Sequence, residues 1–253
     1  MTVHFVGAGP GAADLLTVRA VSLLASSQVC VFAGTYVDDA VLSLCGPGTR
    51  LVDSQHLDLD AITTVLVSAH EAGQDVVRLC SGDPSLYSAL TEQTRRLDAA
   101  GVPWDVTPGV PAYAAAAATL GVELTVPELV QTVVLTRTQE RSTAMPSSES
   151  LEATAAIGGS LVLHLGITRI RSLASTLAEA YGPDCPVAVV AFASQPRQVV
   201  LRGTLSDIAT SVESAGLRHT AVIIVGRALT ARDDDAARVA ESHLYDPSRS
   251  RAE

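Results

Sequence analysis

The chain has 253 residues, 47% of them hydrophobic, and a formal net charge of -10 at pH 7. This length favours two α/β lobes over one, and the acidic total argues against nucleic acid or an anionic membrane as the main partner. No apolar run reaches the roughly 18 to 20 residues that cross a bilayer, and the N-terminus lacks a basic leader, so we expect a soluble cytoplasmic protein.

The first half of the chain alternates short β-branched runs with stretches of helical periodicity. The expected strands are 3–6, 28–32, 50–53, 75–79 and 104–107, and the expected helices are 17–25, 59–72, 86–99 and 112–120. This alternation predicts a first lobe over residues 1–120, with a mainly parallel sheet covered by helices on both faces.

Residues 121–130 contain a glycine, a proline and no helical period, so we expect them to link the lobes. The second lobe is expected over residues 131–230. Its candidate strands are 131–136, 159–163, 186–190, 198–201 and 221–225, and its candidate helices are 169–180 and 205–215. A polar loop too short for a helix separates 187–190 from 199–201, which predicts an antiparallel hairpin in a mixed sheet. We expect a mobile surface loop at 142–150 and a flexible tail at 231–253.

Cysteine and histidine side chains give no metal-binding or disulfide pattern. The six histidines are dispersed, and so are the four cysteines, Cys30, Cys45, Cys80 and Cys185. We therefore expect reduced cysteines and no protein-bound metal.

The most informative local feature is the loop Gly7-Ala8-Gly9-Pro10-Gly11 after the first strand. With Ala12 it satisfies the G-x-G-x-x-A pattern of dinucleotide-binding proteins, and an NAD-dependent oxidoreductase is a remote alternative. Pro10 has no N–H for a pyrophosphate, and the helical pattern begins only near Asp14 or Thr17. The second strand also ends in Phe32-Ala33-Gly34, where that class needs an acid.

Two more glycine turns follow strand ends in this lobe, Ser81-Gly82-Asp83-Pro84 and Pro108-Gly109-Val110-Pro111. Carboxyl ends of parallel strands meet at one edge of a sheet, so the three turns predict one binding crevice. Asp83 either accepts hydrogen bonds from a ligand or caps the next helix.

These turns, together with Asp14-Leu15-Leu16-Thr17, resemble the tetrapyrrole methylase family of S-adenosylmethionine-dependent enzymes over about residues 1–230. The resemblance continues at Leu163-His164-Leu165-Gly166 and at Ala221-Val222-Ile223-Ile224-Val225-Gly226. It implies two unequal αβα lobes, a cofactor folded into the active-site cleft between them, and a homodimer.

The stretch 124–137 is similar to the branch that methylates C11 of precorrin-4 or cobalt-precorrin-4 in cobalamin biosynthesis. Tyr87, Glu92, Gln93 and the segment 244–247 are also similar, whereas Ser88 and Ala193 stand where relatives carry glycine. Methylation of another position, on precorrin-2, precorrin-3 or uroporphyrinogen III, is the alternative within the family. A non-catalytic tetrapyrrole-binding module is an alternative from another class.

The resemblance also assigns ligand contacts. It implies that Ser81, Gly82 and Asp83 hold the methionine end of S-adenosylmethionine, that Leu86, Pro111 and Ala112 line its middle, and that Leu165, Ala193 and Ala221 enclose its adenine, with Pro10 at the border. Gly226 would close the last strand. The wall formed by Gly9, Pro10 and Gly11 would face the tetrapyrrole.

Arginine is the candidate group for binding substrate carboxylates, because all 17 basic residues of the chain are arginine. Codon composition is one explanation, and bidentate pairing of guanidinium groups with a polycarboxylate is the other. Arg137 is the first candidate, followed by Arg141 and Arg78. We assign no catalytic residue or general base, since a sulfonium methyl is already activated and the reaction needs placement above all.

Overall fold

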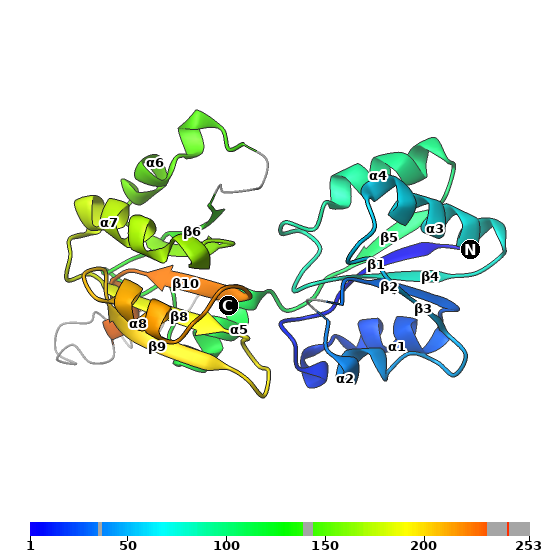
Figure 1. Ribbon diagram of the computed structural model, residues 1–253, viewed down its shortest axis with the longest axis horizontal. Coiled ribbons are helices and arrows are strands. Elements are labelled where there is room, and N and C mark those ends of the chain that lie inside the picture. The colour runs from blue at the N-terminus through cyan, green and yellow to red at the C-terminus, as the bar shows by residue number, and fades with distance from the viewer. Residues whose placement is uncertain (35–36, 139–143, 232–241, 243–253) are drawn as a thin grey trace, which may run out of the picture. The chain divides into compact units, whose positions relative to one another are not determined.

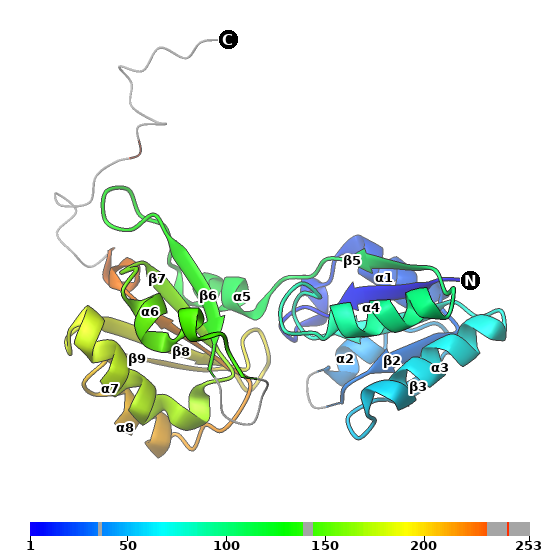
Figure 2. The same cartoon turned by 90° about the horizontal axis from the view of Figure 1, so that it is seen from above.

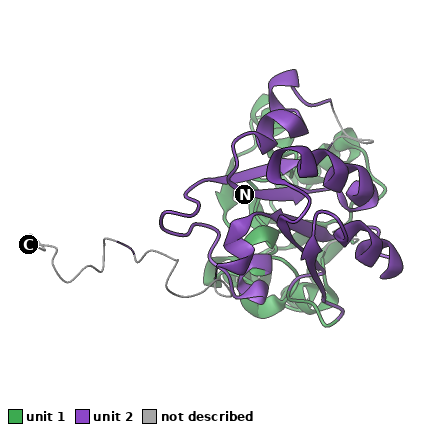
Figure 3. Ribbon diagram, turned by 90° about the vertical axis from the view of Figure 1, so that its left-hand side faces the viewer, with its two compact units in different colours: residues 1–115, 194–196 green, residues 116–193, 197–253 purple. Residues whose placement is uncertain are grey.

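The computed structural model describes residues 1–34, 37–138, 144–231 and 242. The chain divides into two units, Met1–Ala115 with Ser194–Pro196, and Ala116–Ala193 with Arg197–Glu253 (Figure 3). Helix α5 (Ala112–Leu120) therefore begins in unit 1 and ends in unit 2.

Unit 1 contains the predicted parallel sheet, and its five strands lie in the order β3-β2-β4-β1-β5. Its strands are β1 (Val3–Gly7), β2 (Val29–Phe32), β3 (Arg50–Asp53), β4 (Val76–Cys80) and β5 (Trp104–Thr107). Its helices are α1 (Val18–Ser26), α2 (Asp39–Leu42), α3 (Leu59–Glu71) and α4 (Leu90–Ala99), with a 3-10 turn at Ala13–Leu15.

Both faces of the sheet are buried at its three central strands, β2, β4 and β1, because alternate side chains of each strand pack on opposite sides. Phe5 of β1 packs with Leu66 of α3 and Leu97 of α4. Its neighbour Val6 packs with Leu24 of α1 on the other side. Figure 1 shows α3 and α4 over one face and α1 and α2 over the other. The helices cover the faces, so the carboxyl ends of the strands are left to form the site.

Unit 2 contains a mixed sheet in the order β6-β7-β10-β8-β9. Its strands are β6 (Val133–Arg137), β7 (Ser160–His164), β8 (Pro186–Ala191), β9 (Val199–Thr204) and β10 (Ala221–Val225). Only β6 and β7 are parallel within this described sheet, and β8 and β9 form the predicted antiparallel hairpin.

Three helices of unit 2 lie on one face of its sheet, where they share a single core. They are α6 (Leu151–Ala155), α7 (Ile170–Tyr181) and α8 (Ile208–Ser214), with 3-10 turns at Ser147–Glu149, Ile167–Arg169 and Arg227–Thr230. Leu173 and Leu177 of α7 share a core with Ile208 of α8. Figure 2 shows α5 on the opposite side of the sheet from α7 and α8. The expected αβα layering is confirmed in both units.

One local prediction was wrong and another was incomplete. The helix expected over 86–99 begins only at Leu90, because Tyr87 and Ala89 have left-handed backbone with φ of 55° and 54°. The loop expected at 142–150 contains the turn Ser147–Glu149, and Ser150 accepts a hydrogen bond from Ala153 N to cap α6, which the sequence did not predict. Residues 142–143 and all of the expected tail except 231 and 242 lie outside the described residues.

Candidate active site

The three glycine turns of unit 1 meet, as predicted. Strand β1 lies between β4 and β5, so the turns follow three adjacent strands. Gly9 N–H donates to Gly82 O (3.1 Å), and Gly82 N–H donates to Gly9 O (2.8 Å). This pair of bonds fixes the opening loop directly to the second turn.

Glycine is required where these turns touch. A β-carbon added at Gly7 would lie 2.5 Å from both Cα and N of Gly109 and 2.8 Å from Gly82 O. These atoms all belong to backbone, which cannot swing away as a flexible side chain does. The turns therefore pack backbone against backbone, and the surface that they form consists largely of peptide groups.

Asp83 holds the second and third turns together. Its Oδ2 accepts from Gly109 N–H (2.8 Å), and its Oδ1 accepts from Ser85 N–H (2.9 Å) and from the Ser85 hydroxyl. Burial opposes ionisation of this carboxyl, but the bonds from Ser85 and Gly109 outweigh it and lower the pKa of Asp83. The alternative that Asp83 caps a helix is wrong, because α4 begins only at Leu90.

The other cofactor residues expected in unit 1 lie next to these turns. A β-carbon at Gly82 would be 3.6 Å from Pro111 Cα and from Ala112 N, which begins α5. Leu86 N–H donates to Asp83 O (3.2 Å) in the turn that follows, and the Ser81 side chain is exposed. The structure thus brings together the residues expected to contact the methionine end and the middle of the cofactor.

The opening loop has partners that sequence reasoning missed. Ala12 N–H donates to Ser194 Oγ (3.1 Å), and Gln195 Nε2 donates to Pro10 O (3.3 Å). A β-carbon at Gly11, where φ is +148°, would overlap the Gln195 side chain. Because these partners are more than 180 positions apart in the chain, no local pattern could have identified them.

Arg78 is buried, contrary to the expectation that it serves as a clamp for substrate carboxylates. It lies within β4 and is only 9% exposed. Its Nε donates to Gln93 Oε1 (3.1 Å) and its Nη1 donates to Ser54 Oγ (3.0 Å). Burial lowers the pKa of this guanidinium, partly offset by the thiols of Cys80 and Cys30. This network connects β4 to α4 and to the end of β3.

Gln93 links Arg78 by hydrogen bonds to the turn after Asp83. Its Nε2 donates to Ser88 O (3.2 Å) and to Ala89 O (3.1 Å), within the left-handed segment before α4. Left-handed backbone in residues other than glycine costs about 1–3 kcal/mol and persists where its surroundings hold it. Arg78 therefore supports the turn rather than presenting itself to a ligand.

The three residues expected around adenine lie at one edge of the sheet in unit 2. Antiparallel pairing of β10 with β8 places Ala221 opposite Ala191, two positions before Ala193. Antiparallel pairing of β10 with β7 aligns Ile223 with Leu163, so Leu165, two positions later, lies at the same end of the sheet as Ala221. We call Leu165, Ala193 and Ala221 the adenine row.

Backbone strain concentrates at this edge. Leu165 has φ of 55° and is 57% exposed. Ala193 lies between Phe192 (φ 52°) and Ser194 (φ 65°), and Ala221 follows Thr220 (φ 54°). Strained backbone of this kind clusters at binding sites, where it shapes a surface that relaxed backbone would not provide. The adenine positions taken from the resemblance thus coincide with an unusual feature of the fold. Gly226, expected to close the last strand, directly follows β10 with φ of 136°.

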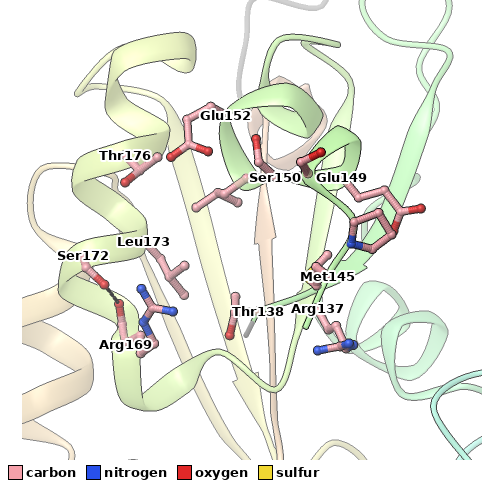
Figure 4. A pocket seen from close by; sticks show the side chains of 13 residues that line it. Arg137, Thr138, Met145, Glu149, Ser150, Glu152, Arg169, Ser172, Leu173 and Thr176 are labelled. Carbon is pink, nitrogen blue, oxygen red and sulfur yellow. Dashed lines mark hydrogen bonds between the residues drawn. The ribbon is translucent and has the colours of Figure 1, made fainter. Parts of the chain in front are cut away.

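Arg137 ends β6, as expected, and lines a pocket in unit 2 together with Thr138 and Arg169 (Figure 4). Sequence reasoning did not select Arg169, whose signal would have been its place just before the helix 170–181. Arg141 lies outside the described residues.

The described part of the chain offers no group of three or more His, Cys, Asp or Glu side chains arranged for a metal ion. In the same ranges, none of the helices combines the length and hydropathy of a bilayer span.

Comparison with known proteins identifies the class. Residues 2–209 match the family of tetrapyrrole (corrin/porphyrin) methylases, and the chain belongs to this family. The dinucleotide interpretation of the opening loop is therefore wrong, in agreement with the start of α1 at Val18, well beyond the glycines.

The chain is also similar to individual members of this family over most of its length. The chain is 53% identical to the precorrin-4 C(11)-methyltransferase of Rhodococcus erythropolis over 251 residues, which cover 99% of each chain. The X-ray structure of a cobalt-precorrin-4 methyltransferase matches with a TM-score of 0.87 and 33% identity, covering 90% of this chain and 95% of that one. Uroporphyrin-III C-methyltransferase from Thermus thermophilus, in complex with S-adenosylhomocysteine, matches with a TM-score of 0.77 and 28% identity, covering 90% and 99%.

Proposed function

We propose that the protein transfers a methyl group from S-adenosylmethionine to C11 of precorrin-4 in cobalamin biosynthesis. The observation that carries this proposal is 53% identity, across 99% of both chains, to an enzyme named for that reaction. Other family members act on other tetrapyrroles, but the identity to the uroporphyrin-III enzyme is only 28%.

The residues of unit 1 suit the polar end of S-adenosylmethionine. Gly7, Gly82 and Gly109 leave peptide groups uncovered by β-carbons. Asp83 uses its oxygens for Ser85 and Gly109, yet a carboxylate has about four acceptor positions, so it retains capacity for the cofactor's ammonium group.

The residues of unit 2 suit the other end of the cofactor. The row of Leu165, Ala193 and Ala221 is apolar and offers an exposed leucine to an aromatic ring. Small alanine side chains in that row leave room for an adenine against the sheet edge. The contacts assigned to these residues remain part of the proposal.

When bound, S-adenosylmethionine supplies a methyl group that its sulfonium has already activated. An electron pair at C11 of the macrocycle forms the new C–C bond, and the pair of the broken C–S bond returns to sulfur. The chain's residues have to bring C11 and the methyl carbon to about 3–3.5 Å in line and keep water away. This requirement matches the described glycine turns, which offer mainly peptide groups and small side chains.

We further propose the cobalt-free macrocycle as the substrate, because identity is 53% to a precorrin-4 enzyme and 38% and 33% to two cobalt-precorrin-4 enzymes. Cobalt held by the ring nitrogens requires no protein ligand, so the distinction has to be measured. The expected active-site cleft between the lobes, the homodimer and the cytoplasmic location also stay predictions. Light scattering during size-exclusion chromatography measures the oligomeric state.

The decisive experiment incubates the purified protein with methyl-labelled S-adenosylmethionine and either precorrin-4 or cobalt-precorrin-4. We expect label in the macrocycle, with a higher kcat/KM for precorrin-4. A higher value for the cobalt form would contradict only the choice of substrate. Absence of label with both forms would contradict the C11 activity, and retention of a tetrapyrrole without transfer would favour a binding module.

A further inference from the structure

Gln93 is an amide side chain in the interior of unit 1. It lies in the first turn of α4 and is 2% exposed. A buried amide is costly if its oxygen or its NH2 group lacks a partner, so both ends need partners inside the protein. Gln93 Oε1 accepts from Arg78 Nε (3.1 Å). Its Nε2 donates to Ser88 O (3.2 Å) and to Ala89 O (3.1 Å), so the side chain connects a buried charge to the backbone just before the helix.

Arg78 determines which way this amide points. A guanidinium has only donors, whereas an amide has an acceptor oxygen at one end and a donor NH2 group at the other. Arg78 is itself buried, and its Nη1 donates to Ser54 Oγ (3.0 Å), which helps to hold the guanidinium in place. The oxygen of Gln93 has to face the guanidinium, so the NH2 group faces the two carbonyls. Reversal of the amide would place donor against donor and acceptor against acceptor.

The two carbonyls belong to a segment of unusual backbone. Tyr87 and Ala89 have left-handed φ of 55° and 54°, and Ala89, the N-cap residue of α4, makes no side-chain cap bond. Left-handed backbone in such residues persists where its surroundings hold it. Gln93 supplies two hydrogen bonds to this segment from a helix that packs into the core of unit 1 through Leu97.

Further hydrogen bonds connect this segment to residues expected to contact the cofactor. The Ser88 hydroxyl donates to Pro84 O, and Leu86 N–H donates to Asp83 O (3.2 Å). A shift of the carbonyls that Gln93 holds would therefore move the turn that carries Leu86 and Asp83.

We propose that Gln93 is a positioning residue for S-adenosylmethionine, and that its amide, oriented by Arg78, sets the affinity of unit 1 for the methionine end of the cofactor. This inference rests on the cofactor contacts proposed for Asp83 and Leu86. Gln93 acts through the turn, and its role depends on the NH2 group. An isosteric carboxylate would keep the bond to Arg78 but lose both bonds to the turn.

The first test compares Gln93→Glu with the matched control Gln28→Glu. Gln28 is exposed and directly precedes β2, at the end of the parallel sheet opposite to the glycine turns. Its Oε1 accepts from Asp75 N–H (2.9 Å), and its Nε2 donates to Ser26 O (2.8 Å). The control therefore makes the same chemical change in an amide that also accepts one bond and donates to a backbone oxygen.

In Gln93→Glu, a carboxylate oxygen faces two carbonyl oxygens, while the other oxygen still accepts from Arg78. We expect the Kd for S-adenosylhomocysteine, measured by calorimetry, to rise at least about tenfold, as loss of buried hydrogen bonds does. Gln28→Glu should leave this Kd unchanged. Equal Kd values for the two variants would overturn the proposal.

A second comparison separates positioning from a general loss of stability. Ser54 Oγ donates to Phe32 O (2.9 Å) and accepts from Arg78, so Ser54→Ala removes one partner of the guanidinium and keeps the bonds of Gln93 to the turn. We expect Ser54→Ala to unfold at a lower urea concentration and to bind S-adenosylhomocysteine with unchanged Kd. A rise in Kd as large as that of Gln93→Glu would overturn the proposal. With the expected Kd values, a wild type that labels neither form of precorrin-4 would support the positioning role and contradict only the proposed reaction.

Discussion

The contact between the glycine turns gives the sharpest prediction, through the substitution Gly7→Ala. The new β-carbon would lie 2.5 Å from Gly109 Cα, where ordinary contact begins at 3.4 Å, so backbone has to move by about 0.9 Å (3.4 minus 2.5). Overpacking of this kind lowers the free energy of unfolding by about 1–3 kcal/mol. A misplacement of about 1 Å at a reacting centre costs up to about 100-fold in rate, so we expect kcat/KM to fall by that order.

The matched control is Gly101→Ala, at the turn between α4 and β5. Gly101 has φ of +70° and no atom within 4 Å of its potential β-carbon. Alanine there costs about 1–2 kcal/mol of left-handed backbone strain, a destabilisation similar to that of Gly7→Ala. Urea unfolding measures both free energies, and methyl transfer measures both rates. We expect only Gly7→Ala to lose activity, and unchanged kcat/KM in that variant would refute the role given to the turns.

Three further predictions concern single side chains. Arg78→Met should lower the free energy of unfolding by about 1–3 kcal/mol, since Gln93 Oε1 loses its donor, and urea unfolding indistinguishable from wild type would disprove the network. Asp83→Asn should lower the free energy of unfolding most above pH about 4, the ordinary carboxyl pKa of the unfolded chain. The folded protein has a lowered pKa at Asp83, so the stabilisation by its carboxylate is complete above pH about 4 and is lost as the pH falls through the lowered pKa. An equal loss of stability at pH 3 and pH 7 would contradict this. Ala221→Leu should weaken S-adenosylhomocysteine binding at least about tenfold in calorimetry while the thermal midpoint shifts by at most about 4 °C, and an unchanged Kd would remove Ala221 from the adenine row.

The parallel sheet and its three turns were predictable because their signals are local. Alternation of strands and helices specifies the layers, and Thr17 caps α1 by accepting from Ala20 N–H, as its residue type indicated. Glycines directly after β-branched runs mark strand ends where backbones approach one another. The family resemblance then indicated S-adenosylmethionine as the ligand, which the periodicity alone did not indicate.

What the sequence did not predict depends on distant partners. Helix α4 starts late because Tyr87 and Ala89 adopt left-handed backbone, which their residue types disfavour and which Gln93 helps to hold. Arg78 was expected at the surface as a clamp, but its partner Ser54 is 24 positions away and came to light only in the fold. A residue type alone does not distinguish an arginine that binds ligand from one that supports a turn.

The supporting role of Arg78 agrees with the needs of the reaction. A preactivated methyl group leaves the protein with the task of placement, so charge is useful where it anchors a substrate carboxylate, and a buried charge near the reacting atoms would gain nothing for bond formation. Arg78 makes its bonds to a hydroxyl and an amide inside unit 1, where it supports the turn after Asp83. Replacing Arg78 should therefore alter the free energy of unfolding and the turn after Asp83, rather than remove a group that binds a substrate carboxylate.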